Sequence, residues 1–199
     1  MSPRSSKAEA AATRSKIVDA ALAAARIDGF EALSLGRLAD TLHMSKAGVV
    51  GPFGSKEALQ EAVFRAAVVQ FDRLVLGRIA GESRGLARLT RLCDAWIDYL
   101  AGEAAAHGGC LLTTAASEYD ARPGLLRDHV AEASRLWEAR LVAEIEGAVA
   151  AGDLPAATDA AQLAFELQGI ALVTNQMIQL HRDRSAPDRA RRAVRRLLG

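Results

Sequence analysis

The chain has few aromatic residues, few cysteines and no long apolar run. Aromatic residues make up 5% of the 199 residues, so aliphatic side chains must fill most of any core. The two cysteines, Cys93 and Cys110, lack the paired spacing of a metal site or a disulfide framework. No stretch of about 18 apolar residues predicts a membrane span, and no apolar N-terminal segment predicts a secretion signal. We therefore expect a cytoplasmic protein with reduced thiols and no membrane partner.

The net charge of +1 argues against a generally basic coat that would bind nucleic acid without specificity. The distribution is uneven, however. Residues 1–56 hold eight Lys or Arg against five Asp or Glu, a net charge of +3, which leaves −2 for the remainder. This asymmetry is expected if only the N-terminal part meets a polyanion.

Helical periodicity recurs along the chain, and no segment alternates with a period of two, so we predict an all-α fold. Thr13 can cap a first helix that Gly29 stops, with residues 1–12 as a disordered arm. The buried face of this helix is expected to carry Ile17, Ala20, Ala21, Ala24 and Ile27.

The segment from Leu33 to Leu59 is the most informative part of the sequence. A short helix with apolar Leu35, Leu38 and Leu42 runs into a turn, and Ser45 can cap a second short helix that ends by Pro52. Two short helices joined by a turn of three or four residues form a helix-turn-helix, whose second helix usually enters the DNA major groove.

Further helices follow in the remaining two thirds of the chain, and they predict a helical body. Ser55 can cap a long fourth helix with two apolar stripes, which links head and body and ends before Gly81. The later helices are expected from Leu86 to Leu100, around 111–115, from Pro123 to about 151, over 158–180 and over 187–198, with a loop over 102–109.

The expected helix over 158–180 is apolar on nearly all sides in its first half, so it must be buried on most sides. We predict a homodimer in which the helices of about 123–151 and 158–181 form a four-helix interface with their mates. The alternative is a core closed within one chain.

Several segments resemble the TetR/AcrR family of bacterial repressors. The resemblance to the DNA-binding head covers residues 13–65, and a looser one extends into the body. The segments that carry it are Ile17–Leu22, Asp28–Phe30, Leu33–Leu35, Leu38–Ala39, Met44–Lys46, Phe53–Leu59, Gly109–Leu112, Glu118–Asp120, Arg122–Gly124, Gln162–Leu167 and Asn175.

The resemblance implies a TetR-like architecture and a mechanism. A DNA-binding domain over 13–60, with its helix-turn-helix at about 34–53, would precede a ligand-binding and dimerisation domain over 61–199. Two heads of an Ω-shaped homodimer would bind a palindromic operator and release it when a small-molecule effector enters the body.

The DNA-contacting residues follow partly from chemistry and partly from the resemblance. Helix N-termini attract phosphates. The resemblance places Lys46, Ala47 and Gly48 at base-facing positions and Lys56 on the backbone, while Gly36 takes a position where some relatives carry a base-reading side chain. The predicted DNA-binding set is Ser34, Arg37, Ser45, Lys46, Ala47, Gly48 and Lys56.

In the body, an apolar cavity with a few polar groups would bind the effector. The predicted lining is Phe71, Trp96, Tyr99, Cys110, Thr113, Thr114, Trp137, Phe165 and Gln168, although any aromatic at helical spacing can also be plain core. We expect no enzyme, no cofactor and no metal, because no motif places a nucleophile beside a base and no third ligand joins His107 and Cys110.

The functional hypothesis is a sequence-specific transcriptional repressor that binds an operator as a homodimer. The alternative is a dimeric ligand-binding or interaction protein whose head no longer reads DNA. It is motivated by Val50, which stands where relatives usually carry an aromatic, and by Pro52, which stands where they carry an aromatic or histidine. Gly51 between them adds flexibility.

Overall fold

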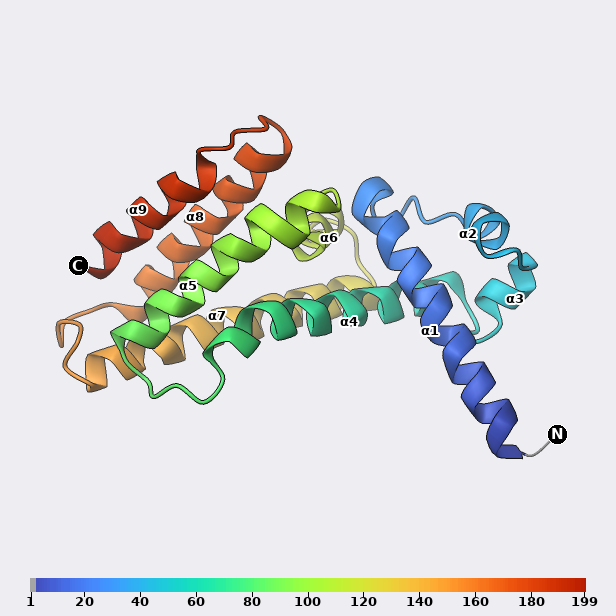
Figure 1. Cartoon of the computed structure of the whole chain (residues 1–199), viewed down its shortest axis with the longest axis horizontal. Coiled ribbons are helices and arrows are strands. Elements are labelled where there is room, and N and C mark those ends of the chain that lie inside the picture. The colour runs from blue at the N-terminus through green and yellow to red at the C-terminus, as the bar shows by residue number, and fades with distance from the viewer. Residues whose placement is uncertain (1–2) are drawn as a thin grey trace. The chain divides into compact units, whose positions relative to one another are not determined.

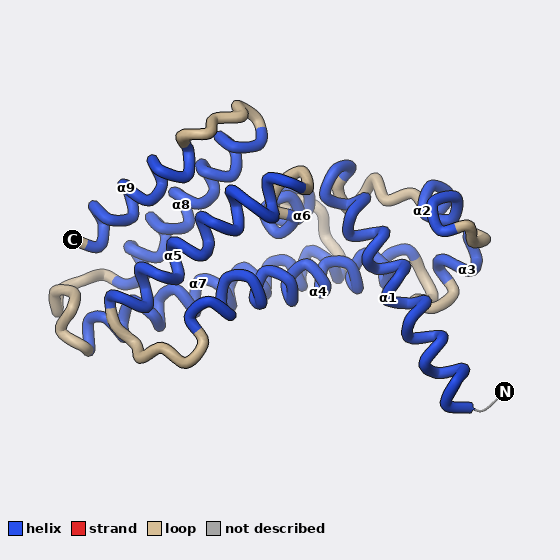
Figure 2. Tube along the Cα trace, in the orientation of Figure 1, coloured by secondary structure: helices blue, strands red, loops and turns tan. Residues whose placement is uncertain are grey.

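The computed structural model describes residues 3–199, and over these residues it contains helices and no strand (Figure 1, Figure 2). The all-α prediction is confirmed. The elements are α1 (Pro3–Asp28), α2 (Leu35–Leu42), α3 (Lys46–Val50), α4 (Lys56–Val75), the 3₁₀ turn η1 (Leu76–Ile79), α5 (Leu86–Tyr99), the π-helical turn η2 (Leu100–Ala104), α6 (Leu111–Tyr119), α7 (Leu125–Ala150), α8 (Ala160–Gln179) and α9 (Ala186–Leu198).

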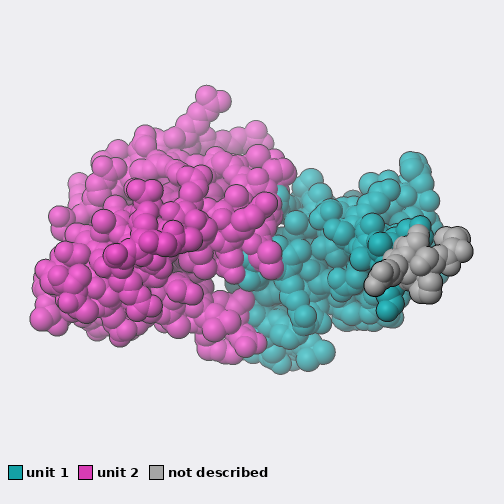
Figure 3. Space-filling view, turned by 60° about the horizontal axis from the view of Figure 1, so that its bottom comes forward, with its two compact units in different colours: residues 1–68, 111–130 teal, residues 69–110, 131–199 magenta. Residues whose placement is uncertain are grey.

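The chain divides into two compact units, which Figure 3 shows in different colours. Unit 1 comprises residues 1–68 and 111–130, and unit 2 comprises residues 69–110 and 131–199. The first parts of α4 and α7 therefore belong to unit 1 and their later parts to unit 2. α6 packs on α1 within unit 1, so this unit is larger than the head expected from the sequence.

The core of unit 1 forms around the turn that follows α1. Phe30, Ile17 and Leu59 are fully buried. The ring of Phe30 meets the rings of Phe64 and Tyr119 edge-on, with centroids 6.1 and 6.4 Å apart. Such aromatic pairs add about 0.5–1.5 kcal/mol each to the free energy of unfolding beyond the area they bury. Phe30, which directly follows the predicted helix stop at Gly29, is thus the centre of the core of unit 1.

The first helix differs from its prediction in its start and in one residue of its buried face. α1 begins at Pro3 instead of Thr13, so the expected disorder over residues 1–12 is wrong from residue 3 on; residues 1 and 2 lie outside the described residues. Residues 3–12 contain many good helix formers and no interior breaker, and proline suits a first turn, so the helix continues through them. Ile27, expected on the buried face, is 80% exposed. Successive residues of a helix are rotated by 100°, and this places Ile27 away from the side that carries the buried Ile17 and Ala21.

In unit 2, α5, α8 and α9 pack against one another (Figure 1). Leu89 and Leu92 of α5 and Leu141 and Ile145 of α7 are completely buried, and Leu167 of α8 joins this core. The core is mainly aliphatic, as the composition predicts. No helix in the described part of the chain is long and apolar enough to cross a membrane.

Two boundaries in the body depart from the prediction. The expected loop over 102–109 is helical through residue 106, because η2 carries the helix past Gly102; a single glycine costs a helix about 1 kcal/mol and does not stop it. The chain turns instead at Gly109, with φ 115°. α7 begins at Leu125 and not at Pro123, since Gly124 before it has φ 141°, outside the helical region.

Candidate nucleic-acid interface

The helix-turn-helix is built by two serine caps and one left-handed residue. Ser34 Oγ accepts the N–H of Arg37 at 3.4 Å, and Ser45 Oγ accepts the N–H of Gly48 at 3.0 Å. Between the helices, His43 has φ 54° and ψ 45° and reverses the chain direction after α2. Both hydroxyls therefore act as helix caps, and each marks a helix N-terminus where a phosphate would find free N–H groups.

The two helices bury one face and expose the other. Leu38 and Leu42 of α2 and Val49 of α3 are buried, whereas Lys46 and Ala47 lie exposed at the start of α3. The predicted amphipathic pattern of this pair is confirmed. The exposed start of α3 leaves a lysine and a methyl group free to meet base edges, which offer a guanine acceptor or a thymine methyl.

Two other cations of the predicted DNA-binding set, Arg37 and Lys56, already have partners. Arg37 forms an ion pair with Asp28, and Lys56 Nζ donates to the carbonyl oxygen of Glu31 at 2.8 Å. Lys46, by contrast, makes no ion pair or hydrogen bond within the described chain. An ammonium group has three donors, so Lys56 retains two for a phosphate.

The end of α3 is compact and lacks an aromatic. Gly51 closes the helix with its N–H donated to the Ala47 carbonyl oxygen at 2.8 Å, and a Cβ at Gly51 would lie 2.8 Å from that same oxygen. Glycine is therefore required there by the close approach of the backbone. Val50 is half-buried and Pro52 is exposed, so the departures noted in the sequence lie at the surface of the head.

A carboxylate of α6 binds the turn between α1 and α2 within unit 1. Glu118 accepts the backbone N–H of Phe30 at 2.9 Å and that of Glu31 at 3.0 Å. Gly29, with φ 84°, permits this approach, because a Cβ there would lie 2.7 Å from Glu118 Oε1. The Gln60 side chain donates to the Phe30 carbonyl at 2.6 Å from the other direction. No local sequence signal predicts this role of Glu118, because the two N–H groups it accepts lie 88 and 87 positions away.

Tyr119, next to Glu118, is buried in the same place. Its hydroxyl donates to Glu31 Oε2 at 3.4 Å. Burial, followed by the nearby carboxylates of Glu31 and Glu118, raises the pKa of Tyr119 to about 12, because each disfavours the phenolate anion.

In unit 2, four of the predicted effector-binding residues form one aromatic cluster. The ring of Phe71 lies edge-on to Tyr99, Trp137 and Trp96, with centroids 5.2, 4.9 and 6.5 Å away, and the two tryptophans are 4.9 Å apart. The indole N–H of Trp137 is buried and has no hydrogen-bond acceptor among the described residues. A buried donor without an acceptor costs about 1–3 kcal/mol, so a ligand that supplies one would be favoured.

The remaining residues of the predicted effector site lie elsewhere. Phe165 is 70% exposed on α8, and Gln168 is half-buried on the same helix. Cys110 is buried, and its N–H donates to Asn175 Oδ1 at 3.1 Å. Thr113 and Thr114 belong to α6 in unit 1.

A surface hollow of about 400 Å³ beside α5 contains none of the predicted residues. Its charges are already paired: Arg78 lies 4.0 Å from Asp98, and Arg191 lies 3.6 Å from Asp94. Among the described residues, no three His, Cys, Asp or Glu side chains are placed to hold a metal ion.

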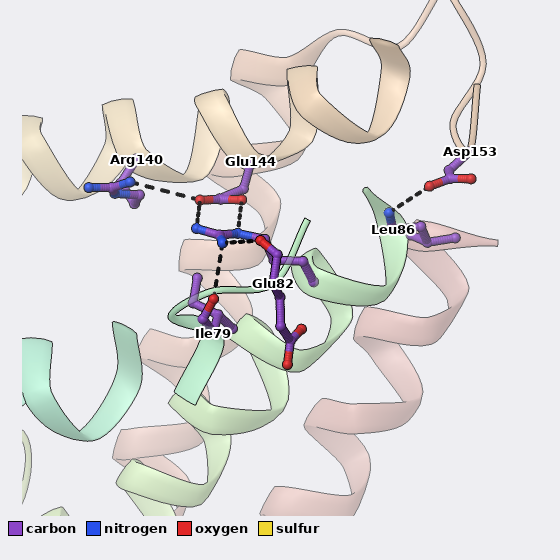
Figure 4. A network of polar contacts seen from close by, with 7 residues as sticks. Ile79, Glu82, Leu86, Arg140, Glu144 and Asp153 are labelled. Carbon is purple, nitrogen blue, oxygen red and sulfur yellow. Dashed lines mark hydrogen bonds and ion pairs between the residues drawn. The ribbon is translucent and has the colours of Figure 1, made fainter. Parts of the chain in front are cut away.

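Unit 2 also contains a buried ion pair, which Figure 4 shows together with Ile79, Glu82 and Arg140. The Glu144 side chain is fully buried and accepts two hydrogen bonds from Arg88, at 2.8 Å from Nε and 3.0 Å from Nη2. Arg88 Nη1 also donates to the carbonyl oxygens of Ile79 and Glu82 at 3.0 and 2.6 Å. One guanidinium thus joins α5, α7 and the chain that leaves η1, and the hydrogen bonds to Glu144 raise the pKa of Arg88.

Comparison with known proteins agrees with this architecture. Residues 17–63 match the family described as "Bacterial regulatory proteins, tetR family", and residues 85–194 match "Tetracyclin repressor-like, C-terminal domain". The second match alone covers more than half of the chain. A comparison with curated proteins gives no match.

Solved structures share the fold at low sequence identity. A TetR transcriptional regulator from Chloroflexus aurantiacus J-10-FL is 20% identical with a TM-score of 0.85, covering 96% of this chain and 94% of its own. A TetR-family regulator from Cytophaga hutchinsonii is 19% identical with a TM-score of 0.84, and the match covers 96% of this chain and 94% of that regulator. AibR was solved in complex with isovaleryl coenzyme A and operator DNA. It is 18% identical with a TM-score of 0.71, and the match covers 90% of this chain and 94% of AibR.

The matched head and body cover the helix-turn-helix and the helical bundle described above. Proteins of this kind are regulators and not enzymes, in agreement with the prediction. The chain therefore belongs to the TetR family of transcriptional regulators, DNA-binding helix-turn-helix proteins with a ligand-binding C-terminal domain.

Proposed function

We propose that this protein is a transcriptional repressor that binds a palindromic operator as a homodimer and leaves it when a small molecule enters unit 2. The observation that carries the proposal is the α2–α3 pair, which presents the unpaired Lys46 beside Ala47 above a buried apolar face. Lys46 would donate to guanine O6 or N7, and Ala47 would contact a thymine methyl. Gly48 would lie beside them at a base-facing position, and Ser34, Ser45, Arg37 and Lys56 would meet the phosphate backbone.

The decisive experiment is enrichment of the purified protein on a pool of random DNA duplexes at about 0.15 M salt. We expect a palindrome whose half-sites are spaced by one helical turn, about 34–36 Å, or by a multiple of it. If no sequence is enriched although the protein is dimeric, the repressor proposal is wrong.

Dimerisation is supported by an apolar face on α8. Phe165, Leu172, Val173 and Leu180 are between 56% and 70% exposed, and at 100° per residue they fall within one stripe of the helix. Four large apolar side chains exposed side by side on one helix are typical of an interface. We propose that α8, with the adjacent exposed side of α7, pairs with the same surface of a second copy.

The matched test compares Leu172→Glu with Val69→Glu, because both replace an exposed apolar residue by a charge. We expect sedimentation analysis to show a monomer for Leu172→Glu and a dimer for Val69→Glu and for the unmodified chain. A dimeric Leu172→Glu variant would place the interface elsewhere.

The aromatic cluster around Phe71 supports an apolar effector that carries a hydrogen-bond acceptor for the Trp137 N–H. Isovaleryl coenzyme A, the ligand in the AibR complex, is a suitable first probe, followed by a panel of apolar small molecules. Binding of the effector should change the tryptophan fluorescence. The Trp137→Phe substitution should lower the affinity for the effector, because it removes the indole N–H.

Release of DNA would be a shift between two states of one dimer. By thermodynamic reciprocity, operator DNA should weaken effector binding by the same factor by which effector weakens operator binding. Equal effector affinity with and without operator would contradict this scheme.

The second candidate function is a ligand-binding or interaction protein with a head that no longer reads DNA. The short end of α3, with Val50 half-buried and Pro52 exposed, favours it. Val50→Tyr restores an aromatic there. A large gain in DNA affinity would indicate that the native head is weakened at this position, and no change would indicate that other contacts compensate.

A further inference from the structure

Gly36, at the second position of α2, is a glycine that its backbone conformation does not require. Its φ lies in the ordinary range for any residue, unlike that of Gly29 or Gly54. Glycine destabilises a helix relative to alanine, so alanine would stabilise α2 if space were available. The reason for glycine must therefore be sought in the space around it.

That space is occupied by the end of the Lys46 side chain. A Cβ at position 36 would lie 3.2 Å from Lys46 Cε and 3.7 Å from both Lys46 Nζ and Ser34 Oγ. The lysine, which starts in α3, thus lies across the bare backbone of α2. No acidic partner among the described residues accounts for this position of the ammonium group.

The other glycines of the helix-turn-helix differ from Gly36. A Cβ at Gly51 would meet the backbone oxygen of Ala47 at 2.8 Å, which cannot move away. A Cβ at Gly48 would meet Ser45 Oγ at 3.2 Å and Met44 Cε at 3.4 Å. Gly36 alone among these three lies against the flexible end of a charged, exposed side chain.

We propose that Gly36 and Lys46 form one base-reading element, in which Gly36 is the positioning residue and Lys46 the contacting residue. The absent side chain at position 36 lets the ammonium group lie over the start of α2, and from there it donates to guanine O6 or N7 in the major groove. Gly36 thereby sets how closely the Lys46 ammonium group lies over α2 and how well it meets its base. This inference deepens the proposed function and rests on it.

The substitution Gly36→Ala tests the proposal because it adds one methyl group and displaces Lys46 while favouring the helix. We expect a urea midpoint equal to or higher than that of the unmodified protein. Because Lys46 Cε must shift by only a few tenths of an ångström, we also expect the preference for guanine at one position of each half-site to weaken, by about two- to threefold, without moving to another base pair. Lys46→Ala should remove the preference at that same position.

The control is Gly36→Ala in the Lys46→Ala background. If Gly36 acts through Lys46, the added methyl group should leave the enriched sequence of the Lys46→Ala variant unchanged. The proposal is overturned if Gly36→Ala leaves the preference of the full protein intact, or if its effect persists without Lys46.

Failure of the proposed function is distinguishable from failure of this inference. An unmodified protein that enriches no sequence would refute the repressor proposal, and the inference would fall with it. An unmodified protein that enriches a palindrome, together with an indifferent Gly36→Ala variant, would refute the inference alone.

Discussion

Replacing Glu144 by glutamine should destabilise the protein more than any exposed carboxylate change. Glu144 is fully buried and is the counter-ion of Arg88, whose side chain is only 16% exposed. Glutamine keeps the shape but removes the negative charge, and it turns one of the two acceptors into a donor that faces the guanidinium. Arg88 then remains a buried cation without an anionic partner.

The size of the effect follows from this burial. Removing one partner of a buried ion pair costs about 3–5 kcal/mol. Arg88 keeps two carbonyl acceptors, those of Ile79 and Glu82, so we expect the lower end, about 3 kcal/mol. For a chain of this length the corresponding fall in Tm is about 6–12 °C.

Urea unfolding followed by circular dichroism at one fixed protein concentration measures this loss. Asp153→Asn is the matched control, because Asp153 accepts the Leu86 N–H at 2.9 Å in an exposed position and should contribute about 1 kcal/mol or less. Arg88→Met combined with Glu144→Gln should cost about 2 kcal/mol less than the sum of the two single changes. A Glu144→Gln variant as stable as Asp153→Asn, or strictly additive changes, would refute the assignment of a coupled buried pair.

Three other substitutions or measurements test the sites described above. Glu118→Ala should lower the free energy of unfolding by about 2 kcal/mol and speed hydrogen exchange at the Phe30 and Glu31 amides, since both N–H groups lose a charged acceptor; unchanged exchange there would contradict the role of Glu118. An unfolded tyrosine loses its proton near pH 10 and folded Tyr119 near 12, so between these values the unfolded state binds fewer protons and stability falls as pH rises. Tyr119→Phe should make this fall in stability with rising pH shallower, and an equal slope in both proteins would contradict a raised pKa of Tyr119 as its cause. Burial, with a smaller contribution from Asp94, raises the pKa of Cys93 to about 12, so about one thiol in ten thousand is ionised at pH 8; a thiol reagent should label it slowly in the native protein and rapidly in urea, and fast native labelling would show an accessible thiolate.

The local features of the head could be predicted because their causes are local. Serine at a helix start and glycine at a helix end act through atoms within four residues, so Ser34, Ser45 and Gly29 indicate α2, α3 and the end of α1 correctly. The apolar spacing likewise indicates which side of α2 is buried.

The long-range features could not be predicted in this way. Glu118 meets Phe30 across 88 positions and Arg88 meets Glu144 across 56, and each carboxylate by itself resembles part of a solvated helix face. An apolar residue at helical spacing predicts burial without naming what buries it. For this reason the sequence alone does not separate Phe71 and Trp137 from Phe165, which lies on the exposed side of α8.

The inclusion of α6 in unit 1 has a consequence for exchanging heads between members of this family. A head cut at residue 68 would lose Glu118 and Tyr119, and with them the acceptor for two backbone N–H groups and one wall of the Phe30 core. A chimera that transplants only the first 68 residues would place this turn against a foreign α6. The smallest transferable piece is therefore discontinuous, and a graft that carries residues 111–130 with the head should express and fold better than one without them.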